Sequence, residues 1–423
     1  ALLPCAARMA ALIPQSILFG NPDKAEPKIS PDGKKYAYLA SSDKGVLNVW
    51  VTLVEGGEPK MITNDTHRGI RMYEWAKDNR HLLFKQDADG DECWHVYSVD
   101  LLTDVVRDLT PFQGIRSEAL FLSKAYPGTI LVGLNILSRK VFDMYRIDLI
   151  TGACVLDTTN EGDVAQWIVD HDFNIRGCVA TVQADGSKVL RVRDTVDLEG
   201  DAWREIARWP HDEEAGVHRF TKDGKGLYVE TSMAHGKGEA LDTTRLIVMS
   251  IYDGSEIEHI ANSKQCNVDE VEFNDDEETV EAVAFDYERQ KWEIIDDAVR
   301  PDYEHLISVC EGNMRIISRS QNDRLWICSD MPDAASPRFF IYDRDAKKDT
   351  MLFLARPELQ KYQLAKMTAH VIMTSDGEEM TGYLTTPVGV EARGLPLVLV
   401  VHGGPWARDR WGWNPQAQWL ANR

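Results

Sequence analysis

Four consecutive residues near the end of the sequence, His402-Gly403-Gly404-Pro405, have the composition of a loop that brings backbone N–H groups close to a ligand. We call these residues the glycine motif. Glycine allows a sharp turn and a close approach because it has no Cβ. Backbone N–H groups held in this way stabilise negative charge that develops on a carbonyl oxygen, and each such donor contributes ~3 kcal/mol to catalysis. The simpler alternative is a glycine turn that only ends a strand.

The residues on either side of the glycine motif favour the chemical interpretation. Residues 395–401 form an almost continuous apolar run, which is typical of a central strand covered by helices on both faces of an α/β sheet. Residues 416–423 have the pattern of the start of a helix. Strand, motif and helix in this order are the context in which a His-Gly-Gly segment supplies one oxyanion-hole donor in lipases and esterases.

Short β-rich runs separated by tight turns make up most of the chain before this region. Asp-Gly and Asn-rich tips favour tight hairpins because these residues tolerate positive φ. The tips that precede apolar runs are Ser30-Pro31-Asp32-Gly33, Lys77-Asp78-Asn79, Ala184-Asp185-Gly186, Lys222-Asp223-Gly224 and Gln321-Asn322-Asp323. Equivalent turns recur every roughly 45 to 50 residues, the size of a four-stranded propeller blade. The alternatives are a long β-sandwich or two stacked β-domains.

The period predicts a mainly β chain in three parts. Residues 1–24 are an N-terminal segment, residues 25–356 a β-propeller of about seven blades, and residues 357–423 the start of an α/β-hydrolase domain. This last part contains a hairpin around Asp376-Gly377 and is expected to be incomplete, because a segment this short cannot complete an α/β domain. Residues 1–19 fit the tail of a targeting peptide, an extension ahead of Met9, or a short helix against the neighbouring domain.

Composition excludes several classes of partner. Lys and Arg number 47 against 68 Asp and Glu, and the formal net charge is −21. Such a balance argues against binding nucleic acid or an anionic membrane surface. The seven cysteines are scattered and show no Cys-x-x-Cys spacing, so we expect free thiols, no metal and no cofactor. These features, and the absence of an apolar run of ~20 residues, predict a cytoplasmic protein.

Two acidic segments have simple structural interpretations. Asp87-Ala88-Asp89-Gly90-Asp91-Glu92 resembles a calcium loop, but its glycine comes too early and Ser98 stands where an EF-hand has its final Glu. We interpret it as a blade hairpin tip, with a role in binding a peptide's amino terminus as the alternative. Asn274-Asp275-Asp276-Glu277-Glu278 is interpreted as a solvated loop.

The glycine motif and its surroundings resemble the prolyl oligopeptidase family of serine peptidases, and within it the acylaminoacyl-peptidase and dipeptidyl-peptidase-like branch. The resemblance at the motif covers residues 397–406 and continues through Arg408, Asp409 and Trp411. It extends over almost the whole chain through Phe19-Gly20-Asn21-Pro22, Ser30-Pro31-Asp32-Gly33, Asp87 to Glu92 with Trp94, and Asp108-Leu109-Thr110-Pro111-Phe112.

The resemblance implies a peptidase whose propeller admits only short peptides to a Ser-Asp-His triad. Gly404 would supply its backbone N–H to the oxyanion hole, and Gly403 and Pro405 would shape the loop. His402 would not be the general base, which in this family comes far later. Gly-x-Ser-x-Gly does not occur in the 423 residues. We therefore expect the chain to end before the triad and to be inactive alone.

Two other function classes compete with a peptidase. A non-catalytic propeller that binds a protein or peptide would carry the last residues as a remnant. A propeller glycosidase would need paired carboxylates at the propeller's centre and would leave the glycine motif unexplained.

Overall fold

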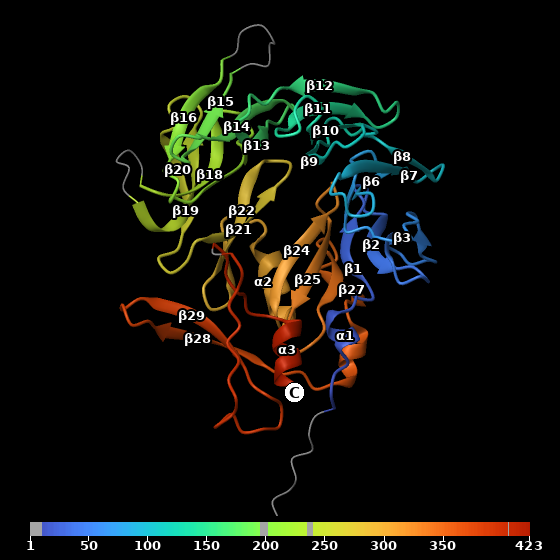
Figure 1. Ribbon diagram of the computed structural model, residues 1–423, viewed down its shortest axis with the longest axis vertical. Coiled ribbons are helices and arrows are strands. Elements are labelled where there is room, and N and C mark those ends of the chain that lie inside the picture. The colour runs from blue at the N-terminus through green and yellow to red at the C-terminus, as the bar shows by residue number, and fades with distance from the viewer. Residues whose placement is uncertain (1–10, 195–201, 235–239, 405) are drawn as a thin grey trace, which may run out of the picture. The chain divides into compact units, whose positions relative to one another are not determined.

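The computed structural model describes residues 11–194, 202–234, 240–404 and 406–423. In this part of the chain seven antiparallel sheets follow one another, six with four strands and one with three (Figure 1). They are the blades of a β-propeller, and each blade is built from strands that are consecutive in the sequence. The prediction of about seven blades is therefore confirmed.

The first four blades contain sixteen of the described strands. Blade 1 has β1 (Ala25–Ile29), β2 (Lys35–Ser41), β3 (Leu47–Leu53) and β4 (Lys60–Met61). Blade 2 has β5 (Met72–Trp75), β6 (His81–Gln86), β7 (His95–Asp100) and β8 (Val105–Asp108). Blade 3 has β9 (Ser117–Leu122), β10 (Thr129–Leu134), β11 (Asp143–Asp148) and β12 (Cys154–Thr158). Blade 4 has β13 (Val164–Val169), β14 (Ile175–Thr181), β15 (Lys188–Val192) and β16 (Arg204–Trp209).

The remaining blades are followed by a hairpin and a helix. Blade 5 has β17 (Ala215–Phe220), β18 (Gly226–Met233), β19 (Ala240–Ser250) and β20 (Glu256–Asn262). Blade 6 has β21 (Val268–Asn274), β22 (Thr279–Asp286) and β23 (Gln290–Ile294). Blade 7 has β24 (Asn313–Arg319), β25 (Leu325–Met331), β26 (Arg338–Asp343) and β27 (Lys348–Leu354). The hairpin is β28 (Met367–Met373) with β29 (Glu379–Thr385), and the described helices are α1 (Gln15–Phe19), α2 (Arg300–Val309), the 3₁₀ helix η1 (Pro357–Lys361) and α3 (Pro415–Ala421).

One turn device recurs between the first two strands of three blades. In blade 7 the hydroxyl of Ser320 donates to Asn322 Oδ1 at 2.7 Å and accepts from the Leu325 N–H at 3.0 Å. Blades 1 and 5 repeat these two bonds at the same spacing and lengths, from Ser30 and from Thr221. A Ser or Thr side chain thus takes up backbone groups that the strands leave unpaired at the turn.

By its internal contacts the chain divides into two compact units. The first consists of residues 1–69, 286–290 and 300–423, and it holds blades 1 and 7 with the hairpin. Its strands β1 and β24 are neighbours, and the Ile29 N–H donates to Ser318 Oγ at 2.9 Å. The second unit consists of residues 70–285 and 291–299. Its core is formed by buried aliphatic residues of successive blades, for example Val132, Leu190 and Ile247.

A short helix follows residue 14 and packs within the first unit. Ile13 and Leu18 are fully buried in a cluster with Leu359 and Trp419, and α1 lies beside α3 (Figure 1). The Ile13 N–H donates to Asn422 Oδ1 at 2.7 Å. A short packed helix was one of the three interpretations of residues 1–19, and it holds for residues 15–19; residues 1–10 lie outside the described residues.

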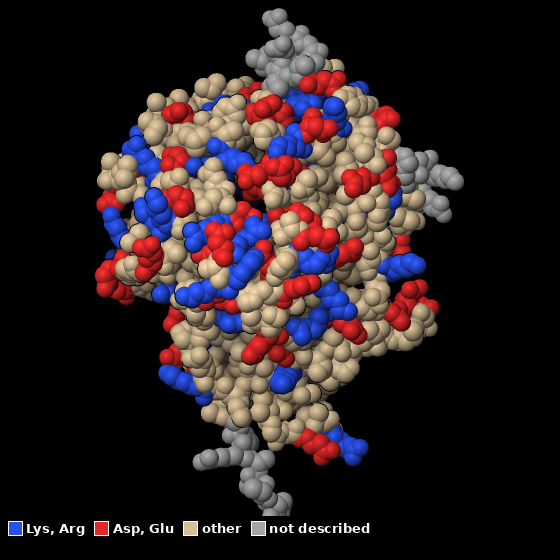
Figure 2. All heavy atoms as spheres, turned by 180° about the vertical axis from the view of Figure 1, so that it is seen from behind, with Lys and Arg blue, Asp and Glu red and all other residues tan. Residues whose placement is uncertain are grey.

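Charged side chains of both signs are intermixed on the surface seen in Figure 2. No helix in the described ranges is long and apolar enough to cross a membrane.

Candidate active site

The glycine motif lies at the surface of the first unit. His402, Gly403 and Gly404 are exposed, and His402 Nδ1 is 3.0 Å from the carbonyl oxygen of Gly403. Pro405 lies outside the described residues. The backbone of residues 402–404 is therefore open to a ligand and is not packed into a core.

The two glycines of the motif differ in what the backbone demands of them. Gly404 has φ of +147°, a conformation that residues with a side chain rarely adopt. A Cβ there would lie 2.9 Å from the Trp406 backbone nitrogen and 3.3 Å from Ala407 Cβ. At Gly403 a Cβ would meet no described heavy atom within 4 Å. Glycine is therefore required at position 404 by conformation and space, whereas neither demands it at 403.

The apolar run before the motif does not form the buried central strand that its sequence predicts. Residues 395–401 have no strand partner among the described residues, and Leu397 and Leu399 are 83% and 82% exposed. A central strand needs neighbours on both edges to take up its N–H and C=O groups. Here β28 and β29 pair with each other. The predicted strand is thus wrong for this structure, because the described chain offers it no sheet to join.

The predictions around that run are confirmed. The hairpin around Asp376-Gly377 is formed by β28 and β29, and α3 occupies most of residues 416–423. The helix begins at a cap in which Asn414 Oδ1 accepts the Ala417 N–H at 2.9 Å, with Pro415 in the first turn.

Two of the three tryptophans that flank the motif are packing residues. Trp411 is 8% exposed, and its indole N–H donates to the Met367 carbonyl at 2.9 Å. Trp413 joins the apolar cluster around α1 and α3. Trp406 is 85% exposed and is the tryptophan of the three that a ligand at the motif could reach.

The first acidic segment is the loop between β6 and β7, as interpreted. Its carboxylates hold the loop's own backbone: Asp91 Oδ1 accepts the N–H groups of Ala88 and Cys93 at 3.1 and 3.0 Å. Within the described ranges no group of three or more His, Cys, Asp and Glu side chains is placed to hold a metal ion.

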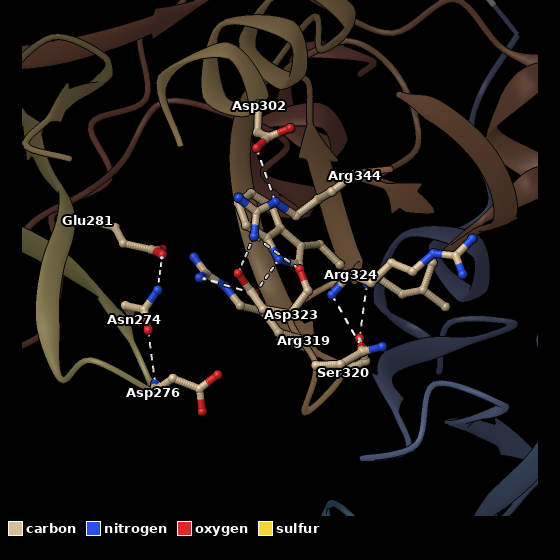
Figure 3. Close-up of polar contacts among 12 residues, drawn as sticks. Asn274, Asp276, Glu281, Asp302, Arg319, Ser320, Asp323, Arg324 and Arg344 are labelled. Atoms are coloured by element: carbon tan, nitrogen blue, oxygen red, sulfur yellow. Dashed lines mark hydrogen bonds and ion pairs between the residues drawn. The ribbon is translucent and has the colours of Figure 1, made fainter. Parts of the chain in front are cut away.

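The second acidic segment is the turn between β21 and β22 in the second unit (Figure 3). Asn274 Oδ1 accepts the Asp276 N–H at 2.9 Å, and Asn274 Nδ2 donates to Glu281 at 3.1 Å. The Asp276 side chain is 60% exposed. The segment is the solvated loop that its charge predicts.

A buried charge network in the first unit fastens α2 to blade 7, and Figure 3 shows its Asp302–Arg344 contact. Asp302 on α2 is 2% exposed and accepts from Tyr342 Oη at 2.6 Å, from Arg344 Nε at 3.1 Å and from Lys347 Nζ. Burial acts to raise the pKa of Asp302, but the hydrogen bonds from Lys347 and Tyr342 and the Arg344 charge outweigh it, and the pKa is lowered. The network is structural because its charges satisfy one another.

The residues directly after the motif are held by a part of the chain that sequence reasoning did not connect with them. Arg408 Nη2 donates to the Tyr287 carbonyl at 2.9 Å, and Arg410 Nη1 lies 3.2 Å from Asp286 Oδ2. Asp286 is 1% exposed and belongs to the same compact unit. No sequence signal could have found this contact, since more than a hundred residues separate the partners.

Two curated proteins are similar to nearly the whole chain. Dipeptidyl aminopeptidase BIII of Pseudoxanthomonas mexicana is 34% identical over 422 residues, and dipeptidyl peptidase family member 6 of Caenorhabditis elegans is 24% identical over 445 residues. Each alignment covers 97% of this chain and 59% of the relative. The chain thus spans about three-fifths of the length of these relatives. No family model matches it.

Two solved structures share the fold. A puromycin-hydrolysing peptidase of Mycobacterium tuberculosis superposes with a TM-score of 0.67 at 12% identity, over 98% of this chain and 67% of that one. A structure from a study of two prolyl endopeptidases superposes with a TM-score of 0.62 at 8% identity, over 89% of this chain and 56% of that one. At such low identity these likenesses establish the propeller-containing fold alone.

Proposed function

We propose that the whole protein is a serine peptidase that hydrolyses short peptides. The premise of this proposal is that the chain belongs to the prolyl oligopeptidase family. The observation that carries this proposal is the 34% identity to a dipeptidyl aminopeptidase over nearly the full chain. Peptide hydrolysis by such a protein proceeds through a serine nucleophile, a histidine base and an orienting aspartate, with backbone donors for the oxyanion.

In this proposal Gly404 supplies one backbone N–H to the oxyanion hole, and Gly403 shapes the loop. The positive φ of Gly404 and the exposure of its backbone support the assignment. Residues 25–356 would gate access as the propeller domain, and residues 357–423 would begin the peptidase domain. The cytoplasmic location stays a prediction of composition.

The 423 residues by themselves are proposed to be inactive. They contain no Gly-x-Ser-x-Gly, the turn on which the nucleophile of α/β-hydrolases sits. An oxyanion donor without a nucleophile stabilises a transition state that cannot form.

A fluorophosphonate probe, which labels activated serines, tests both parts of the proposal. The whole protein should be labelled at a serine within Gly-x-Ser-x-Gly and should hydrolyse dipeptidyl substrates, and prior treatment with a serine-directed inhibitor should abolish both. The 423-residue chain should give no labelling above a heat-denatured control. Labelling of that chain would overturn its inactivity. An unlabelled, inactive whole protein would overturn the peptidase assignment in favour of a non-catalytic binding propeller.

A further inference from the structure

Asp286 is a buried carboxylate at the end of a propeller strand. It is the last residue of β22 and is 1% exposed. Residues 286–290 belong to the compact unit that also contains the glycine motif. A carboxylate removed from water is strongly destabilising unless charged or hydrogen-bonding partners compensate it. The role of Asp286 therefore follows from which residues pair with it.

Two of its partners are arginines that follow the glycine motif. Arg410 Nη1 lies 3.2 Å from Asp286 Oδ2, and Arg408 Nη2 lies 3.8 Å from Asp286 Oδ1. Arg408 also spans two successive carbonyls, since its Nη1 donates to Asp286 O and its Nη2 to Tyr287 O at 2.9 Å. The same Nη2 also donates to the Tyr383 hydroxyl at 3.2 Å. A planar guanidinium held at several points has a fixed orientation, which a single ion pair would not give.

Trp411, which follows Arg410 in the chain, makes three further contacts. The Arg289 guanidinium lies 3.7 Å from the centre of the Trp411 ring, and the Trp411 carbonyl accepts from Asn313 Nδ2 at 3.2 Å. The indole N–H of Trp411 donates to Met367 O at 2.9 Å. The side chains of Arg408, Arg410 and Trp411 thus each contact residues far away in the sequence, whereas Gly403, Gly404 and Trp406 are exposed. Arg408, which is held by contacts to Asp286 and Tyr287, lies only four positions after Gly404.

We propose that Asp286 is a positioning residue for the glycine motif: by holding Arg408 and Arg410 it fixes the chain directly after the motif, and so the direction of the Gly404 N–H. This inference rests on the proposed function. An oxyanion donor acts only if it points at the developing charge, and a displacement of ~1 Å can cost 10²-fold in rate. Asp286 would therefore influence the transition state without touching substrate.

Asp302 shows that a buried carboxylate with basic partners need not have this role. It has a similar burial, 2% exposed, and pairs with Arg344 and Lys347. Its partners fasten α2 to blade 7, and none of these three contacts reaches residues 402–412. Asp302→Asn is therefore a matched control: it removes a comparable buried charge from the same unit at a place unconnected with the motif.

Hydrogen–deuterium exchange on the 423-residue chain tests the anchoring directly. Asp286→Asn should raise amide exchange in residues 406–412 by about tenfold, because Arg408 and Arg410 lose their ion pairs with the carboxylate and only the carbonyl contacts of Arg408 and the contacts of Trp411 remain. Asp302→Asn should leave exchange there unchanged. Arg408→Lys is a milder second variant that keeps the charge and the Asp286–Arg410 pair but loses the planar fork; it should raise exchange in the same residues. Unchanged exchange in folded Asp286→Asn and Arg408→Lys would overturn the proposal.

Kinetics of the whole protein separate this inference from the proposed function. Asp286→Asn and Arg408→Lys should lower kcat by at least ~10-fold with KM within ~2-fold, because the oxyanion contact is made in the transition state. Asp302→Asn should retain the wild-type kcat. A wild-type whole protein that is neither active nor labelled by fluorophosphonate refutes the peptidase function and, with it, the catalytic role of Asp286. An active wild type in which Asp286→Asn has the same kcat as Asp302→Asn refutes the positioning role alone.

Discussion

At the scale of single residues, the candidate site depends on one glycine more than on the motif as a unit. The sequence presents Gly403 and Gly404 as equivalent, since neither composition nor spacing distinguishes them. The structure does, because φ is +147° at Gly404 and a Cβ there would press on the Trp406 backbone nitrogen. A backbone angle is a property of the folded chain, and a local residue pattern does not contain that information.

Gly404→Ala should therefore damage the proposed activity more than Gly403→Ala. In the whole protein we expect the first substitution to lower kcat/KM by on the order of 10²-fold, the cost of a misplaced oxyanion donor, and the second by less than ~10-fold. Steady-state kinetics on a dipeptidyl substrate measure both. Equal losses would mean that the conformation of Gly404 has no special role.

Asp302 should carry a pH-dependent part of the stability. Its folded pKa is lowered below the unfolded value of ~3.9, so its contribution is complete above that pH and is lost as the pH falls through the folded pKa. Asp302→Asn should lower the free energy of unfolding by ~3 kcal/mol at pH 7, and the difference from wild type should narrow below about pH 4.

Urea unfolding at pH 7, 5 and 3.5 measures this difference. Asp276→Asn is the control, because that side chain is 60% exposed and its loss should change stability by less than ~0.5 kcal/mol. If the two variants were equally stable at pH 7, the buried network of Asp302 would contribute nothing beyond a surface ion pair.

At the scale of elements, local sequence patterns predict the strands and turns of the blades. They do not predict elements whose formation depends on residues far away in the sequence. The Asp-Gly and Asn tips lie between paired strands as expected, because turn conformation is set within a few residues. Helix α2 was not predicted: its packed face is formed by Asp302, Tyr303 and Leu306, and a buried aspartate hides the apolar periodicity. Residues 395–401 read as a central strand, yet strand formation requires neighbours that a sequence pattern does not supply.

The exposure of residues 395–401 gives a direct test. Leu399→Asp should change the stability of the 423-residue chain by less than ~0.5 kcal/mol, because the side chain is 82% exposed. Ile327→Asp should lower it by at least ~3 kcal/mol, because Ile327 is fully buried in β25 and an unpaired carboxylate would replace it. Urea midpoints measured side by side decide the matter. A large loss of stability from Leu399→Asp would show that residues 395–401 are buried, as the sequence predicts.

At the scale of the whole molecule, the net charge predicts which partners the protein will not bind. The net charge of −21 is spread over a surface on which both signs are intermixed (Figure 2). A polyanion would meet repulsion overall, whereas a cationic or neutral peptide would not. This prediction needs the composition alone, because net charge is a sum over residues and does not depend on how the chain folds.

The 423-residue chain should accordingly pass through a heparin column at ~50 mM salt and be retained by an anion exchanger, since polyanion binding depends on release of counterions by basic clusters. A neutral agarose column controls for non-specific adsorption. Retention on heparin that persists at ~0.2 M salt would reveal a basic site that the net charge conceals.

The unpaired apolar run also has a consequence for how cells would treat these residues. Leu397 to Val401 offers five uncharged, proline-free aliphatic side chains to water, each at least 42% exposed. Stretches of this kind seed cross-β stacking between copies, and exposed apolar segments are what chaperones and quality-control proteases recognise. The residues that lead into the glycine motif would therefore govern the lifetime and yield of the 423-residue chain, quite apart from any chemistry that the motif performs.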